Sequence, residues 1–324
     1  MKKKIPIGEL KLGMYVNLPS AWRAHPFLRN SFTITSEKQI RKLIDHGIHH
    51  VIIDVSQGTQ HDGPIRKTKE PEKDFTRDLQ TVASENLKEV IADKKMPPPQ
   101  RAQAIHNHSV NMMKGLWENP TGEKISEFKK TVCGVVDLVF SDNAISNQLL
   151  KITSYDYDTY IHSVNVGVLA ISLAREILKK HDQHDMHALG AGFFLHDIGK
   201  VYIDEAIINK PEKLNEQEMG IMRRHPAMGF KLLNETRQIS IESRLIVLQH
   251  HERDNGIGYP RKLRGEDIHI YGRICSVADV FDALVSKRPY KPQLKPFDAL
   301  KLMKEEMLDH LHKEVFEQFV LLFR

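Results

Sequence analysis

The stretch LIVLQHHERDNGIGYP, residues 245–260, joins an apolar helical segment to a turn that contains two glycines and a proline. Leu245 and Leu248 recur at the spacing of one helix face. His250 and His251 stand where the apolar segment ends. Placing imidazole groups in an apolar interior costs free energy unless they are paired or bind a metal. The stretch therefore predicts a helical fold that carries metal-capable side chains into its core.

The same combination of an apolar helical run with histidine or aspartate recurs along the chain. Asp158 and His162 are four residues apart, so on a helix they would share a face. In GAGFFLHDIGKV, residues 190–201, an apolar helix leads to a His-Asp pair, and Gly199 is predicted to end that helix. A single histidine of this kind has ordinary explanations, such as packing in the core or exposure at the surface. The whole series is better explained by one shared metal site. The other members of the series are His196, Asp197, His225, Asp279 and Asp282.

The residue types indicate which metals and which chemistry to expect. Imidazole with carboxylate favours iron, manganese, zinc or nickel over calcium or magnesium. The absence of cysteine among the candidate ligands argues against a structural zinc site. A carboxylate such as Asp197 can bridge two ions. Two ions about 3.5–4 Å apart are the usual arrangement for phosphoester hydrolysis.

Three motifs taken together, HDIGK (196–200), HP (225–226) and HHERDNGIGYP (250–260), resemble the HD-GYP family of metal-dependent phosphohydrolases over about residues 145–295. The resemblance implies an all-helical bundle around two divalent ions, iron or manganese, with a third ion in some members. It also implies that Asp197 bridges, that His196, Asp197 and Asp279 hold one side, that His225, His250 and His251 hold the second ion, and that His162 completes the set.

Further roles follow from the resemblance. Lys200 and Asp197 would be catalytic, with Lys200 stabilising developing charge. A solvated lysine at a helix end is the alternative, but the position of Lys200 three residues after the His-Asp pair favours the catalytic role. Asp158 stands where three-ion members carry glutamate, so a third ion is left open. The substrate would contact Gly258, Tyr259, Arg288 and Lys291; a packing role for Tyr259 and a solvated basic loop around the last two are the alternatives.

The activity implied by the family is hydrolysis of cyclic di-GMP, a bacterial second messenger, to pGpG and in some members to GMP. Two alternatives stay open: cyclic GMP-AMP as the substrate, and a non-catalytic receptor or adaptor for cyclic dinucleotides. The complete set of predicted ligands favours an enzyme over a receptor. The GYP loop is also a proposed docking surface for diguanylate cyclase domains, and a homodimer remains open.

The first part of the chain predicts a different architecture. Residues 1–55 alternate short apolar runs with turns, include a short helix with Ile40, Leu43 and Ile44 on one face and Gly47 as its cap, and end in a buried strand, HHVIIDV. LKLGMYV (10–16), Trp22 and HPF (25–27) resemble an accessory domain of unknown function that precedes some HD-GYP proteins.

The expected fold class is therefore mainly α: a helical bundle around a metal centre, preceded by a small α+β domain. Residues 56–101 are expected to form a polar linker with a helical segment at 77–93 and a break at KKMPPPQR (94–101). The helical phosphohydrolase domain is expected over residues 102–324.

Composition narrows the possible partners. The 324 residues are 40% hydrophobic and carry a formal net charge of +5, spread along the chain. Mild basicity suits an anionic ligand but not duplex nucleic acid, which requires a concentrated basic face. Only two cysteines are present, Cys133 and Cys275, which suits a reducing cytoplasm, and no stretch has the length of a membrane span.

Overall fold

The computed structural model describes residues 2–7, 10–17, 31–34, 39–40, 43, 50–54, 79–152, 158–178, 183–286 and 293–324. The chain forms two compact units, residues 1–73 and residues 74–324, and each is considered separately. Several sequence predictions lie outside the described residues: the linker at 56–76, Ile44 and its Gly47 cap, Trp22 and HPF (25–27), and the substrate contacts Arg288 and Lys291.

The first unit contains a four-stranded antiparallel sheet in the order β1-β4-β2-β3. The strands are β1 (Lys2–Pro6), β2 (Tyr15–Asn17), β3 (Ser31–Thr33) and β4 (His50–Asp54). In β4, Val51 and Ile53 are buried whereas Ile52 is half-buried, so the strand has one core face and is not buried on both sides. The small core also contains Ile5, Leu10, Val16, Ile34 and Leu43.

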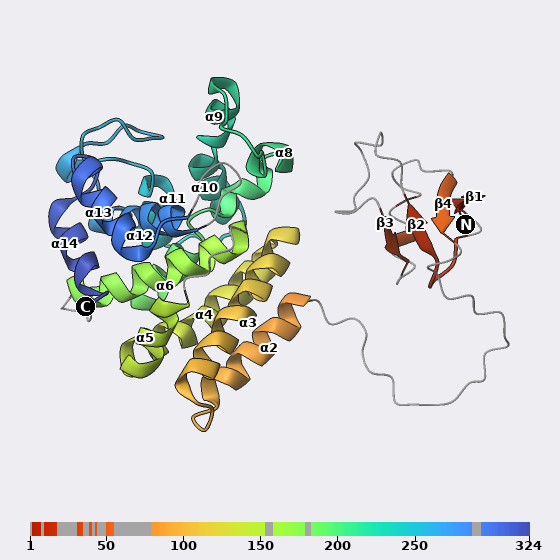
Figure 1. The fold of residues 1–324 in the computed structure, drawn as a ribbon, viewed down its shortest axis with the longest axis horizontal. Helices are drawn as coiled ribbons and strands as arrows, with labels where there is room; N and C mark the ends of the chain where they lie inside the picture. The colour runs from red at the N-terminus through yellow and green to blue at the C-terminus, as the bar shows by residue number, and fades with distance from the viewer. Residues whose placement is uncertain are drawn as a thin grey trace. The chain divides into compact units, whose positions relative to one another are not determined.

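The second unit is a bundle of helices, which confirms the predicted fold class (Figure 1). Among the described residues, none of its helices is long and apolar enough to span a membrane. The elements are α2 (Leu79–Ala92), α3 (Pro98–Glu118), α4 (Gly122–Ser141), α5 (Asn143–Lys151), α6 (Thr159–Ile177), α7 (Met186–Phe194), η3 (Ile198–Tyr202), α8 (Glu205–Ile208), α9 (Glu216–Met222), α10 (His225–Glu235), α11 (Ile241–Gln249), η4 (Gly265–Asp267), α12 (Ile270–Val285), α13 (Pro296–Glu306) and α14 (Lys313–Leu321).

Helices α6 and α12 form the centre of this unit. Both are buried over most of their length rather than along one stripe, as expected for helices that other helices cover on all sides. Helix α6 contacts α3, α4, α7 and α12, and α12 also contacts α11, α13 and α14. Figure 1 shows α2, α3 and α4 side by side along one side of α6. Polar residues on α6 and α12 therefore reach the interior of the bundle.

Local sequence signals set the helix boundaries. The three prolines after residue 96 separate α2 from α3, and the last of them, Pro99, lies in the first turn of α3, where its missing N–H costs nothing. Asp185 caps α7 by accepting from Ala188 N at 2.9 Å. A reciprocal capping box between Asn215 and Glu218 begins α9.

The prediction that Gly199 ends a helix is wrong. Helix α7 ends at Phe194, and Gly199 lies inside the 3-10 helix η3. A Cβ atom on Gly199 would lie 2.0 Å from the carbonyl oxygen of His225 and 2.4 Å from the backbone nitrogen of Gly229. Glycine is therefore required because the backbones of η3 and α10 touch at this point, beside the HD motif.

This contact gives a stability prediction with a matched control. Gly199→Ala should lower the free energy of unfolding by about 1–3 kcal/mol, since the added methyl group overpacks two backbones. Gly220→Ala, on the exposed face of α9 with no atom within 4 Å of the added Cβ, should leave stability unchanged or raise it by up to about 1 kcal/mol. Thermal unfolding of both variants measures the difference, and equal melting temperatures would contradict the backbone contact.

Candidate metal centre

The seven predicted metal ligands meet in the interior of the second unit. They come from five separate segments of the chain, two of which supply a pair of adjacent ligands. His162 lies in α6, the His-Asp pair follows α7, His225 is the first residue of α10, and Asp279 lies in α12. His250 is the C-cap of α11, and His251 follows it. In exposed fraction, His196, His225 and His250 are at 0%, Asp197 at 1%, His162 at 2% and Asp279 at 7%.

The seven side chains form two groups of potential ligand atoms. One group consists of His162, His196 and Asp279, and the other of Asp197, His225, His250 and His251. Within each group the nitrogen and oxygen atoms lie within 4.8 Å of one another. The sequence prediction assigned His162 only as a completing ligand, whereas the geometry places it with His196 and Asp279.

Asp197 connects the two groups. Its Oδ2 lies 3.5 Å from His162 Nε2 and 3.4 Å from His196 Nε2. Its Oδ1 lies 3.1 Å from His225 Nε2 and 3.6 Å from His250 Nε2. Each carboxylate oxygen thus faces a different pair of imidazole groups, which is the arrangement that a bridging carboxylate requires.

Four of the histidines are fixed in the orientation of metal ligands. His196 Nδ1 lies 2.8 Å from Phe193 O, His225 Nδ1 2.7 Å from Met222 O, and His250 Nδ1 3.0 Å from Val247 O. His162 Nδ1 lies 2.7 Å from a carboxylate oxygen of Asp282. Because carbonyl and carboxylate oxygens only accept, each Nδ1–H donates, and each Nε2 faces the centre as the atom that can bind a metal. This pattern is usual for histidines that bind metals.

Two buried atoms of the centre make no hydrogen bond within the described residues: His196 Nε2 and Asp197 Oδ1. Their neighbours at 3.1–3.6 Å are close but lack hydrogen-bond geometry. Buried polar atoms without partners are rare in folded proteins, and a bound cation is one of the accepted explanations. The donor set of imidazole and carboxylate also fits a divalent transition metal. The residues present therefore fit the metal that the predicted site requires.

The protonation states favour metal binding at most positions. Burial lowers the pKa of His250 to about 4, and burial together with neighbouring His250 holds the pKa of His251 well below its usual range. Burial alone would raise the pKa of Asp197, but the nearby Lys200 and His196 outweigh burial and hold that pKa well below its usual range. Neutral imidazoles and ionised carboxylates are the forms that bind metals.

The pKa of His162 is shifted in the opposite direction from those of His250 and His251, because His162 interacts with Asp279 and two other carboxylates. Burial would lower the pKa of His162, but hydrogen bonds with Asp197, Asp279 and Asp282 hold that pKa well above its usual value. Burial would raise the pKa of Asp279, but His162 and His251 hold it well below. This half of the centre therefore carries excess negative charge, and a proton or a metal ion at His162 compensates it.

Lys200 contacts the centre directly. Its Nζ donates to Asp197 Oδ2 at 2.5 Å, and its side chain is only 11% exposed. The alternative of a solvated lysine at a helix end therefore does not apply. The ammonium group places a fixed positive charge beside the carboxylate that joins the two groups of ligands.

The GYP loop is held by its own glutamate. Glu252, 2% exposed, accepts from Arg261 N at 2.7 Å and from Leu263 N at 2.9 Å. A Cβ atom on Gly258 would lie 2.5 Å from Arg253 N, so this glycine permits the loop to fold against its own start. Gly258 therefore has a packing role, and its expected contact with the substrate stays a prediction.

Two adjacent residues shape the turn of this loop. Gly256 adopts the left-handed conformation, with φ of 82°. The Asn255 side chain accepts from Ile257 N at 3.2 Å, an Asx turn.

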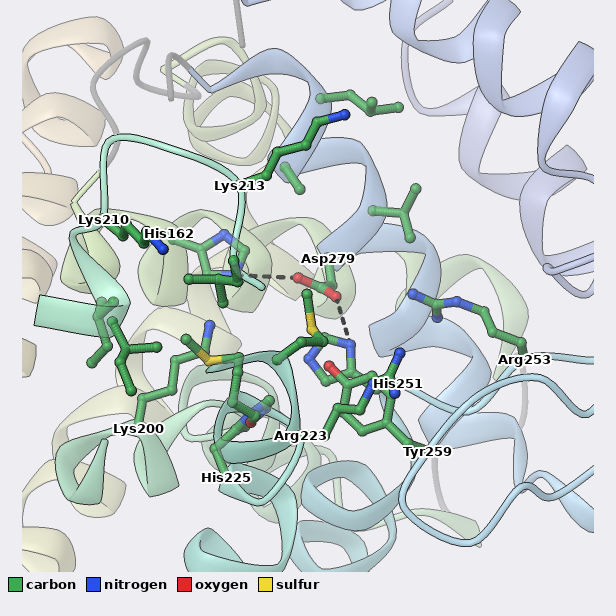
Figure 2. A pocket seen from close by; sticks show the side chains of 18 of the residues that line it. His162, Lys200, Lys210, Lys213, Arg223, His225, His251, Arg253, Tyr259 and Asp279 are labelled. Atoms are coloured by element: carbon green, nitrogen blue, oxygen red, sulfur yellow. Dashed lines mark hydrogen bonds and ion pairs between the residues drawn. The ribbon is translucent and has the colours of Figure 1, made fainter. Parts of the chain in front are cut away.

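A cavity of about 570 Å³ opens beside the metal-binding side chains. Figure 2 shows Asp279 between His162 and His251, with Tyr259 on the same side of the cavity as His251. The Tyr259 ring centre lies 4.6 Å from that of His251, so this predicted pocket residue does line the cavity. The size is within the usual range for ligand pockets.

The cavity is lined by more positive charge than the sequence analysis identified. Lys210, Lys213, Arg223 and Arg253 join Lys200 in its wall. Arg223 lies over the Tyr259 ring, 5.8 Å from its centre. Lys210, Lys213 and Arg223 lie between α8 and α10, where nothing in the sequence distinguishes them from solvated basic residues. Together they make the cavity suited to an anion.

Asp158 does not join either group of ligands. It is exposed, and its carboxylate caps α6 by accepting from Tyr160 N at 3.0 Å. The aspartate is therefore explained by helix capping. The predicted sharing of a helix face with His162 is wrong as well, because Asp158 precedes the first residue of the helix.

A helical bundle around a buried cluster of histidine and carboxylate side chains is the arrangement expected of a metal-dependent phosphohydrolase. Family comparison agrees: the HD domain family matches residues 147–315, more than half of the chain. The chain belongs to the HD domain family, and its motifs are those of the HD-GYP proteins. A domain of unknown function, DUF3391, matches residues 2–124, which confirms the accessory domain and extends through α2 and α3.

Curated relatives are named as phosphodiesterases. The cyclic di-GMP phosphodiesterase PA4108 of Pseudomonas aeruginosa is 32% identical over 99% of this chain and 76% of its own length. The response regulator RpfG of Xanthomonas campestris, named a cyclic di-GMP phosphodiesterase, is 52% identical over 98 residues, and the 3'3'-cGAMP-specific phosphodiesterase 2 of Vibrio cholerae is 49% identical over 98 residues. These matches cover 26% and 19% of those two relatives.

The fold also matches a solved structure. Bd1817, an HDG"Y"P protein from Bdellovibrio bacteriovorus, superposes with a TM-score of 0.62 over 100% of this chain and 99% of its own, at 17% sequence identity. At that identity the likeness establishes the fold alone. It supports the helical HD architecture independently of the motifs.

Proposed function

We propose that the chain is a metal-dependent phosphodiesterase that hydrolyses cyclic di-GMP to pGpG, and further to GMP. The observation that carries the proposal is the pair of ligand groups joined by Asp197 at the end of a cationic cavity. The PA4108 relative, matched over nearly the whole chain, supports cyclic di-GMP as the substrate. The centre is proposed to hold two divalent ions, iron or manganese, because its donors are imidazole and carboxylate.

When bound, such ions supply Lewis-acid activation of a phosphodiester and lower the pKa of a bound water. The chain's own residues would do the rest. Lys200 would hold positive charge beside Asp197, where negative charge develops during phosphoester cleavage. Tyr259 and Arg223 would form one wall for a flat, anionic nucleotide, and the buried walls would exclude water from the reacting phosphate.

A second substrate has a specific observation in its favour. Over matches of 98 residues each, the chain is about as similar to a cyclic GMP-AMP phosphodiesterase as to a cyclic di-GMP one, at 49% and 52% identity. Cyclic GMP-AMP therefore remains the alternative substrate. A receptor without turnover is the weaker alternative, because all seven predicted ligands are present and converge.

The proposed partners and location extend the same account. Ile257, 67% exposed near the turn of the GYP loop, gives the loop an apolar contact for a diguanylate cyclase domain. Both cysteines are free, which suits a bacterial cytoplasm. Cyclase docking, a homodimer and the predicted domain boundaries at 55 and 101 remain predictions.

Turnover is tested with protein purified without oxygen, loaded with iron or manganese, and incubated with cyclic di-GMP and cyclic GMP-AMP. We expect cleavage of at least one substrate and a loss of at least about 10³-fold in His196→Ala/Asp197→Ala, because the metal supplies several kcal/mol of the stabilisation and each 1.36 kcal/mol is tenfold. The faster substrate identifies the purine preference. Metal-loaded protein that binds both nucleotides tightly and cleaves neither would contradict the enzyme and leave the receptor.

The cavity cations give a separate prediction. Lys210 Nζ is paired with Glu218 at 2.6 and 2.8 Å, whereas no described residue forms an ion pair with Lys213 or Arg223. Lys213→Ala and Arg223→Ala should each raise KM by about tenfold, the size of a lost charge-assisted hydrogen bond, with a smaller change in kcat. Lys210→Ala is the matched control and should change KM less. Equal effects in all three variants would show that only net charge matters.

A further inference from the structure

A continuous chain of buried hydrogen bonds leads from the metal centre to helix α3. His162 Nδ1 lies 2.7 Å from Asp282 Oδ2, and Asn165 Nδ2 donates to Asp282 Oδ1 at 2.9 Å. The Asn165 Oδ1 atom then lies 2.9 Å from His106 Nε2. All four side chains are at most 6% exposed, so water does not compete with these bonds.

The chemistry of the groups fixes the direction of every bond. Asp282 accepts from His162 and Asn165, and Ser286 Oγ donates to its Oδ2 at 3.2 Å. Asn165 must therefore turn its NH₂ group to Asp282 and its oxygen to His106. That oxygen can only accept, so His106 donates through Nε2–H. Burial lowers the pKa of His106 below its ordinary value, which suits a neutral ring that donates.

We propose that His106 is a positioning residue of the metal centre, acting through Asn165 and Asp282 on the ligand His162. His106 fixes the amide of Asn165, the amide and Ser286 fix the carboxylate of Asp282, and that carboxylate holds His162 with its Nε2 facing Asp279 Oδ1 at 3.2 Å. Partners that orient a metal-binding histidine commonly change metal affinity 10–100-fold. The inference rests on the proposed metal centre and is independent of the substrate.

His106 lies in a part of the chain that a different family matches from the one that matches the metal ligands. Helix α3 lies within residues 2–124, which the DUF3391 family matches, whereas Asn165, Asp282 and His162 lie within the HD match at 147–315. The last helix of the domain of unknown function thus supplies a side chain to the support of the metal centre. The proposal thus gives α3, a helix of the second unit that the DUF3391 family also matches, an indirect role at the metal centre.

The test measures manganese affinity of the full chain by competition with a chelator. His106→Phe removes the donor but keeps a ring, and we expect about a threefold to tenfold loss of affinity, less than for a direct partner of the ligand. His106→Gln keeps an amide donor and should restore most of the affinity. Asn165→Leu breaks the same chain from α6 and should reproduce the loss if His106→Phe does not fold.

The matched control is Ser84→Ala, which removes a buried hydrogen bond of 2.7 Å between α2 and α4, with Thr131, away from the centre. It should lower stability without changing manganese affinity. In the double variant with Asp282→Ala, His106→Phe should add no further loss, because the connection is already broken. Wild-type affinity in His106→Phe, an equal loss in Ser84→Ala, or additive losses in the double variant would overturn the proposal. Absence of manganese binding in the wild type would instead refute the proposed metal centre.

Discussion

The arrangement of the second unit depends on one buried carboxylate, Asp197, that faces two groups of imidazoles at once. An ionised carboxylate with almost no exposure to water is costly unless positive groups surround it. Here Lys200 and the histidines provide that surrounding, and the pKa of Asp197 stays well below its usual range as a result. Every segment that contributes a ligand must pass close to the same point, and η3 and α10 touch backbone to backbone at Gly199 beside it.

The support of the centre extends well beyond its ligands. Carbonyl oxygens at the ends of α7, α9 and α11 orient three histidines, and Asp282 on α12 orients the fourth. The chain of polar contacts then continues to α3, at the boundary between the DUF3391 match and the HD match. These hydrogen bonds, all within the second unit, therefore connect residues of the two family matches.

The sequence predicted the helical fold and the seven converging side chains because polar residues inside apolar helical runs are costly and therefore informative. The sequence could not show which oxygen of Asp197 faces which histidine. For the same reason it could not assign His162 to the group that contains His196 and Asp279. Asp158 was predicted as a possible ligand because it stands four residues before His162, but this spacing is equally compatible with a helix cap. Gly199 was assigned to a helix end, whereas a close backbone approach between η3 and α10 requires a glycine there. Gly258 is required where the GYP loop folds against its own start, which the sequence did not show. Lys213 and Arg223 gave no signal because isolated basic residues are usually solvated.

The most direct test of the account is the metal content of single ligand variants after reconstitution without oxygen, measured by mass spectrometry of the metals. His225→Ala and Asp279→Ala each remove a ligand from one group, so each should retain close to one of the two proposed ions. Asp197→Ala removes the carboxylate that both groups share and should retain almost none. If Asp197→Ala keeps as much metal as the other two variants, Asp197 does not join the two groups into one centre, and the account of this site is wrong.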